Sequence, residues 1–238
     1  MQKIPPLEHG KYYHIYNRGN NSEDLFKCSD NYLHFLNLYD KYIDLVADTF
    51  AYCLMPNHFH LLVRIREENE IFPISKNQPL SGHKASDRVD SSKTLAALED
   101  GKTLSAVANP DSGLSKRISW IPKPDKQFSH LFNSYAQAFN KQQNRHGSLF
   151  ETPFHRIPID SDKYFCHLVY YIHNNPVHHG LMEHLADYPW SSYQTIISNK
   201  VTKLKRKEVI DWFDDFENFI SFHKYNHDID VGSEFAFE

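Results

Sequence analysis

The chain has 238 residues, of which 40% are hydrophobic and 24% charged, proportions that are ordinary for a soluble globular protein. It contains no run of about 18 apolar residues, so we expect no transmembrane helix and no membrane partner. Three widely spaced cysteines without a C-x-x-C pair favour a reducing, cytoplasmic location. The net charge of −4 does not favour a nucleic-acid partner, although a local basic patch would be enough for one.

The first predicted elements are a strand and a helix. Residues 11–17 are rich in β-formers and end at the turn signal around Gly19, which predicts a strand. Apolar residues recur at helical spacing over residues 30–46, with Ser29 or Asp30 as candidate caps. A strand followed by a helix this early indicates a mixed α and β fold.

Residues 49–54 and 58–66 predict a hairpin, because Pro56-Asn57 suits a tight turn between them. Successive side chains of a strand point to opposite faces, so His58 and His60 share one face, about 7 Å apart along the strand. The other face is a candidate core face, formed by Phe59, Leu61, Val63 and Ile65. Two imidazoles at this spacing could hold one metal ion, although a His-x-His pattern alone is more often two ordinary histidines.

The composition changes between residues 67 and 126, where Pro, Ser, Gly, Asp and Lys dominate. A short helical stretch around residues 94–98 is possible within it. An irregular segment of this length is usually an insertion, a binding loop or a flexible region. We interpret it as a peripheral insertion whose role the sequence leaves open.

Two amphipathic helices and a strand follow. Phe128, Leu131, Phe132, Tyr135 and Phe139 recur at helical spacing, and this helix ends near Asn144. Residues 154–159 predict a short strand, and a second helix runs from about Ser161 to Asn174, ended by Pro176. A last helix is predicted over residues 207–225, after a basic run at 200–207 that is either a solvated face or a contact with phosphate.

The helix that starts near Ser161 carries the best chemical partner for the two histidines. Tyr171 and Asn175 are four positions apart and lie together on the flank of its apolar stripe, whereas Tyr170 points towards solvent. Tyr171 is therefore the better candidate for chemistry. The nearby His173, His178 and His179 are expected to be solvated or to face DNA.

Five motifs together carry a resemblance to a known family. They are Tyr16-Asn17-Arg18-Gly19-Asn20, Pro56-Asn57-His58-Phe59-His60-Leu61-Leu62-Val63, Gly147-Ser148-Leu149-Phe150, Tyr171-Ile172-His173-Asn174-Asn175-Pro176-Val177 and Trp190-Ser191-Ser192-Tyr193. In this order they resemble the HUH (His-hydrophobic-His) single-strand transposases, within the Y1 transposase superfamily, and most closely the REP-associated tyrosine transposases. The resemblance covers roughly residues 11–197, so we expect a catalytic domain over 1–197, interrupted by the insertion at 67–126, and a C-terminal helical extension over 198–238.

The resemblance implies an α+β, ferredoxin-like antiparallel sheet flanked by helices. It also implies a divalent metal, Mg²⁺ or Mn²⁺, held by His58, His60 and a third ligand one turn after the catalytic tyrosine. The tyrosine position is Tyr171 and the third-ligand position is Asn175. Arg18 and Asn20 match a further family motif and are candidates for DNA contact.

The chemistry of such a site can be argued from the residue types. Two neutral imidazoles and one amide oxygen leave open metal positions for phosphate oxygens. Attack by a tyrosine would give a covalent phosphotyrosine and keep the ester for later rejoining. Taken with the resemblance, this chemistry predicts a transposase that cleaves and rejoins single-stranded, hairpin-associated DNA.

Two other functions stay open at this point. One is a domesticated, non-cleaving hairpin-DNA-binding protein, which the mild acidity and the large insertion suggest. The other is a metal-dependent phosphodiesterase with water as its nucleophile. The sequence also leaves open whether the tyrosine helix serves the histidines of its own chain or those of a partner in a homodimer.

Overall fold

The computed structural model describes residues 6–75 and 119–225. Four antiparallel strands form its main sheet, in the order β2-β3-β1-β6. Their bounds are Tyr12–Arg18 (β1), Ala47–Leu54 (β2), His58–Ile65 (β3) and His155–Ile159 (β6). Helix α1 (Ser29–Tyr42) connects β1 to β2, and α2 (Pro124–Gln143) precedes β6. This βαββαβ order with antiparallel pairing confirms the predicted α+β, ferredoxin-like class.

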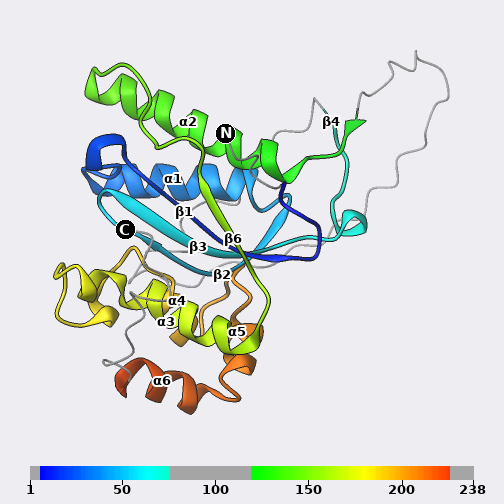
Figure 1. Cartoon of the computed structure of the whole chain (residues 1–238), viewed down its shortest axis with the longest axis vertical. Helices are drawn as coiled ribbons and strands as arrows, with labels where there is room; N and C mark the ends of the chain where they lie inside the picture. The colour runs from blue at the N-terminus through cyan, green and yellow to red at the C-terminus, as the bar shows by residue number, and fades with distance from the viewer. Residues whose placement is uncertain (1–5, 76–118, 226–238) are drawn as a thin grey trace, which may run out of the picture.

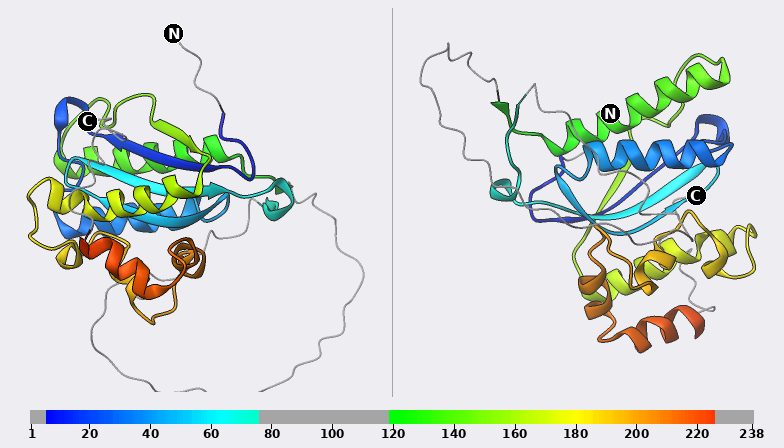
Figure 2. Two further views of the ribbon diagram at one scale, coloured as in Figure 1. Left: turned by 60° about the horizontal axis from the view of Figure 1, so that its bottom comes forward. Right: turned by 180° about the vertical axis from the view of Figure 1, so that it is seen from behind.

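The helices form layers on both faces of the sheet (Figure 1). Helices α1 and α2 lie side by side over one face, and α3 (Asp162–His178) covers the other. Beyond α3 lie α5 (Arg206–Trp212) and α6 (Phe216–Tyr225), which both contact it (Figure 2). The remaining short elements are η1 (Asn20–Ser22), η2 (Glu68–Glu70), β4 (Ile74–Ser75), β5 (Ser119–Trp120), η4 (Leu185–Asp187) and α4 (Tyr193–Ile197). None of the helices within these described ranges is long and apolar enough to span a bilayer.

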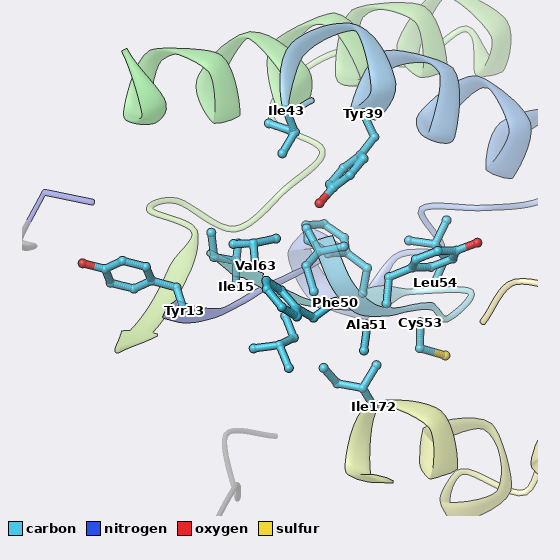
Figure 3. Close-up of a cluster of buried hydrophobic side chains, with 14 of the residues drawn as sticks. Tyr13, Ile15, Tyr39, Ile43, Phe50, Ala51, Cys53, Leu54, Val63 and Ile172 are labelled. Atoms are coloured by element: carbon cyan, nitrogen blue, oxygen red, sulfur yellow. The ribbon is translucent and has the colours of Figure 1, made fainter. Parts of the chain in front are cut away.

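The main core lies between the sheet and the α1–α2 layer. Tyr39 of α1 and Ile43, directly after the last residue of α1, point onto the sheet from one side, and Ile172 of α3 approaches it from the other (Figure 3). The predicted core face of β3 is confirmed, because Phe59, Leu61, Val63 and Ile65 are at most 1% exposed. Burial of each such side chain contributes about 1.5–3 kcal/mol. This packing fixes which face of β3 turns towards α3, and that face carries His58 and His60.

Helix α3 continues through Pro176 to His178, so the prediction that it ends before the proline was wrong. A proline removes one backbone N–H and one helical hydrogen bond. Here the loss falls in the last turn, where the helix is about to end. Asn175 therefore lies inside the helix, one full turn after Tyr171.

The predicted last helix is two helices, α5 and α6, because Asp214 between them adopts a positive φ of 69°. Their packing on α3 overturns two further expectations. Tyr170 is 1% exposed, with its ring against Phe222 and His223 of α6, and His173 is fully buried. Helical periodicity identified only the apolar stripe that faces the sheet, and a second layer buries the opposite face as well.

Helix α2 begins inside the segment that the sequence marks as an insertion at about 67–126. Helix α2 already begins at Pro124, a residue favoured at the first helical position. Strands β4 and β5 pair with each other on the two flanks of the segment. The possible helix at residues 94–98 lies outside the described residues.

Candidate functional site

One face of the sheet, the face covered by α3, carries a dense set of polar and aromatic side chains. The strand register places Tyr16 opposite His60 on β3 and opposite His155 on β6. Arg18 lies opposite His58 in the next row. Because side chains alternate along strands, these residues share the face with His14. The sheet alone therefore gathers residues from three strands.

Helix α3 adds the two residues that the sequence singled out. The Tyr171 ring lies 5.2 Å from the His60 ring, measured between centroids, and is only 7% exposed. The Asn175 Oδ1 atom lies 3.0 Å from His58 Nε2. Residues four apart on a helix share a face, so one turn of α3 meets both histidines. The structure brings His58, His60, Tyr171 and Asn175 together within one chain.

The environment of His58 suits a cation. Its Nδ1 lies 2.7 Å from Asn57 Oδ1 and its Nε2 lies 3.0 Å from Asn175 Oδ1, so a carbonyl oxygen faces each ring nitrogen. A neutral imidazole has one N–H to donate. A proton on Nδ1 satisfies Asn57, and a cation beside Nε2 would satisfy both Nε2 and the Asn175 oxygen.

Two further observations agree with a divalent metal at this position. Adjacent ligands of a six-coordinate Mg²⁺ or Mn²⁺ ion are about 3 Å apart, which is the His58–Asn175 separation. The Asn175 Nδ2 atom is buried and forms no hydrogen bond within the described residues, and Oδ1 is the amide atom that faces His58. Across residues 6–75 and 119–225, no group of three His, Cys, Asp or Glu side chains is placed to hold a metal. A three-ligand site here therefore depends on the asparagine.

His14 is a part of the site that the sequence argument missed. Its Nε2 lies 2.9 Å from His60 Nδ1, and the two rings are stacked. Complete burial, followed by the neighbouring His60, lowers the pKa of His14 well below its usual value, so His14 is neutral and its Nε2 can accept a hydrogen bond from His60 Nδ1. A proton donated from His60 Nδ1 leaves Nε2 of that ring as the atom able to bind a metal. The signal was present, because His14, Tyr16 and Arg18 alternate along the predicted strand.

A cavity of about 280 Å³ opens beside the histidines. Its walls include Tyr16, Arg18, His58, His60 and His155, together with Glu151 and His179. The Arg18 Nε atom lies 3.6 Å from Glu151 Oε1, and both side chains are more than one third exposed. His179 is one of the three histidines expected to be solvated or to face DNA. It is exposed, and its ring lies 5.1 Å from the His58 ring, beside the candidate site. A cavity of this volume has room for part of a nucleotide chain.

Asn20 lies elsewhere and has a different contact. Its Nδ2 donates to the Ser148 carbonyl at 3.1 Å, and its backbone N–H donates to the Leu149 carbonyl at 2.9 Å. Gly19 beside it pairs with Phe150, and a Cβ at Gly19 would meet the Glu23 carbonyl oxygen at 2.0 Å. The motifs around Gly19 and Ser148 therefore form one structural unit that holds the end of β1.

Tyr16 is a second tyrosine next to His60. The two rings are stacked with centroids 5.8 Å apart. Burial, with a smaller contribution from Tyr164, raises the pKa of Tyr16 to about 12. Its phenol is therefore protonated at neutral pH.

No protein-family model matches the chain. A curated protein of Haemophilus influenzae named as a REP-associated tyrosine transposase is 23% identical over 154 residues, which are 65% of this chain and 63% of that protein. The match therefore spans less than two thirds of the relative's length. A solved REP-associated tyrosine transposase bound to a REP hairpin has a TM-score of 0.50 to this chain, with 14% identity, 85% of this chain covered and 88% of that one. At that identity the structural match shows the shared fold. The chain is thus similar to one REP-associated tyrosine transposase in part of its sequence and to another in its fold.

Proposed function

We propose that this protein cleaves and rejoins single-stranded DNA beside hairpins, with Tyr171 as the nucleophile. The observation that carries the proposal is the convergence of Tyr171 and Asn175 from one turn of α3 onto His58 and His60. A transposase relative and a structural neighbour bound to a hairpin support the choice of substrate. All four side chains come from one chain, so a homodimer that exchanges α3 is not needed to complete the site.

His58, His60 and Asn175 are the residues that would hold a divalent metal, Mg²⁺ or Mn²⁺. When bound, such an ion would neutralise charge on the scissile phosphate and help the tyrosine to lose its proton. His14 orients His60 for this role through the bond to its Nδ1. Arg18, at the edge of the same cavity, would contact the DNA backbone in place of its exposed and weak pairing with Glu151.

The reaction of Tyr171 is a transesterification. Its phenolic oxygen attacks the phosphorus, the bond from phosphorus to one deoxyribose oxygen breaks, and that oxygen takes up a proton to leave as a hydroxyl. The other strand end stays joined to Tyr171 as a phosphate ester. A DNA hydroxyl can then reverse the step and rejoin a strand.

A denaturing gel tests the proposal directly. End-labelled hairpin oligonucleotides with single-stranded flanks are incubated with the protein and Mn²⁺, and a protein–DNA adduct that survives denaturation is expected. Tyr171→Phe should abolish the adduct. Tyr170→Phe is a matched control, because it removes a hydroxyl from the adjacent buried tyrosine and should keep the adduct. No adduct with the wild type, or an adduct with Tyr171→Phe, would contradict the proposal.

The second candidate is a hairpin-binding protein that does not cut. The direct contact of Asn175 with His58 and the burial of Tyr171 favour it, because both close the site. It predicts salt-sensitive hairpin binding without cleavage under any divalent metal. Cleavage that is lost in His58→Ala would reject it.

A further inference from the structure

Three rings form a ladder across the strands beside the candidate metal site. The Tyr16 and His155 rings are stacked, with centroids 4.7 Å apart and planes 9° apart. On its other side Tyr16 stacks on His60, at 5.8 Å and 27°. These contacts follow from the register, since Tyr16 is the cross-strand neighbour of both histidines. The ladder therefore starts at a proposed metal ligand and runs outwards to β6.

The outer end of the ladder is open to solvent. β6 is an edge strand of the sheet, and His155 is its first residue and is exposed. His155 and Tyr16 both line the 280 Å³ cavity that also contains His58 and His60. An exposed ring stacked nearly parallel on a second ring, at the mouth of such a cavity, offers a flat and rigid surface for another planar group.

We propose that the Tyr16–His155 stack binds an unpaired nucleobase close to the scissile phosphate. This inference rests on the proposed function, because it takes single-stranded DNA as the occupant. Bases stack on aromatic side chains with little sequence preference, since every base has a π-face. A phosphate held beside His60 places a base of the same strand near the stack. The stack would thus hold the strand in register for attack by Tyr171.

The stacking role is distinct from metal binding or proton transfer by His155. Stacking needs a flat ring and no particular nitrogen, so His155→Phe should preserve it and His155→Ala should remove it. The exposed edge position makes both substitutions tolerable to the fold. His130→Ala is a matched control, because it removes an exposed histidine from α2 on the opposite side of the sheet.

A thermodynamic cycle tests the contact. Fluorescence anisotropy measures the affinity of a hairpin oligonucleotide with single-stranded flanks for Tyr171→Phe protein, with an abasic site moved along the flanks. At one position the abasic site should weaken binding about tenfold. The same abasic site should leave the affinity unchanged for protein that also carries His155→Ala. It should still weaken binding about tenfold for protein that carries His155→Phe or His130→Ala.

The outcomes separate this inference from the function on which it rests. If hairpin DNA is bound and cut but no abasic position couples to His155, the stacking site is overturned while the proposed function stands. If His155→Phe behaves like His155→Ala, the ring nitrogens matter and stacking is also overturned. If no hairpin oligonucleotide binds to any variant, both proposals fail.

Discussion

Two pairs of buried histidines make the same contact in two regions of this molecule. His14 Nε2 and His60 Nδ1 are 2.9 Å apart in the sheet, and His173 Nδ1 and His223 Nε2 are 2.9 Å apart between α3 and α6. His60 of the first pair lines the cavity, whereas both histidines of the second pair are sealed inside the protein. The contact itself is therefore not what distinguishes a candidate site from a structural pair.

The sealed pair belongs to a chain of hydrogen bonds with a single direction. The Tyr52 backbone N–H donates to Ser192 Oγ at 2.9 Å, and the Ser192 hydroxyl donates to His173 Nε2 at 2.8 Å. His173 Nδ1 then donates to His223 Nε2, and His223 Nδ1 donates to the Phe219 carbonyl at 2.8 Å. Each ring has one donor and one acceptor in use, so both histidines are neutral and no position is left for a ligand.

The cavity-side pair ends differently. Beyond His60 the neighbouring residues are His58, with a carbonyl oxygen at each ring nitrogen, and the Tyr171 ring. In a neutral His58 with its proton on Nδ1, no hydrogen lies between Nε2 and the Asn175 oxygen, and a cation could occupy that position. The comparison teaches that the groups at the end of a histidine chain distinguish a candidate ligand site from a pair that supports the fold.

The largest expected difference between the pairs is in activity. His60→Ala should lower cleavage about 10³-fold, the scale of losing a group that stabilises transition-state charge. His173→Ala should keep cleavage within a fewfold of the wild type, although both substitutions truncate a buried ring and should lower the melting temperature. Adduct formation and thermal melting on the same samples separate the two effects. Equal loss of cleavage in both variants would erase the distinction.

The second expected effect is on pH-dependent stability. Burial lowers the pKa of His223 to about 4, and the titratable groups packed against it are His173 and Tyr170 from α3 and Tyr193 from α4. An unfolded histidine titrates near 6.5, so between pH 6.5 and 4 the unfolded chain takes up a proton that the folded chain excludes. This proton alone should make the free energy of unfolding highest above pH 6.5 and lower it by up to about 3 kcal/mol towards pH 4.

Urea unfolding across this pH range measures the effect. His223→Leu should lower stability at pH 7 and reduce the dependence on pH, because it removes the excluded proton. His34→Leu is a control on α1, since it removes a histidine far from this network. An unchanged pH slope in His223→Leu would show that other groups cause the acid sensitivity.

The smallest expected effect concerns His14. His14→Phe keeps a ring beside His60 but removes the acceptor that fixes its Nδ1 proton. Loss of such an outer partner typically weakens metal binding 10- to 100-fold. Cleavage titrated with Mn²⁺ should shift to higher metal concentration and recover at saturation. A lowered maximum with an unchanged midpoint would mean that His14 does not act through the metal.

The sequence predicted the parts of the site that follow from local periodicity. Alternation along β3 was enough to place His58 and His60 on one face, and the four-residue spacing placed Tyr171 with Asn175. It failed for Tyr170 and His173, because their burial depends on α6, which is distant in the sequence. Tyr16 and His155 escaped notice for a similar reason, since their contact depends on the pairing of β1 with β6.

Because Tyr16 lies between two strand partners, the geometry of the site depends on the exact number of residues in β1. Removal of one residue within β1 would shift the pairing register on one side of the deletion. Because the side-chain period of a strand is two, those of His14, Tyr16 and Arg18 that lie on that side would turn towards the α1–α2 layer. A substitution at any one of these positions removes the contacts of one side chain, whereas such a deletion would misplace every site residue of β1 on one side of it. Natural variation in β1 is therefore expected to consist of substitutions far more often than of insertions or deletions.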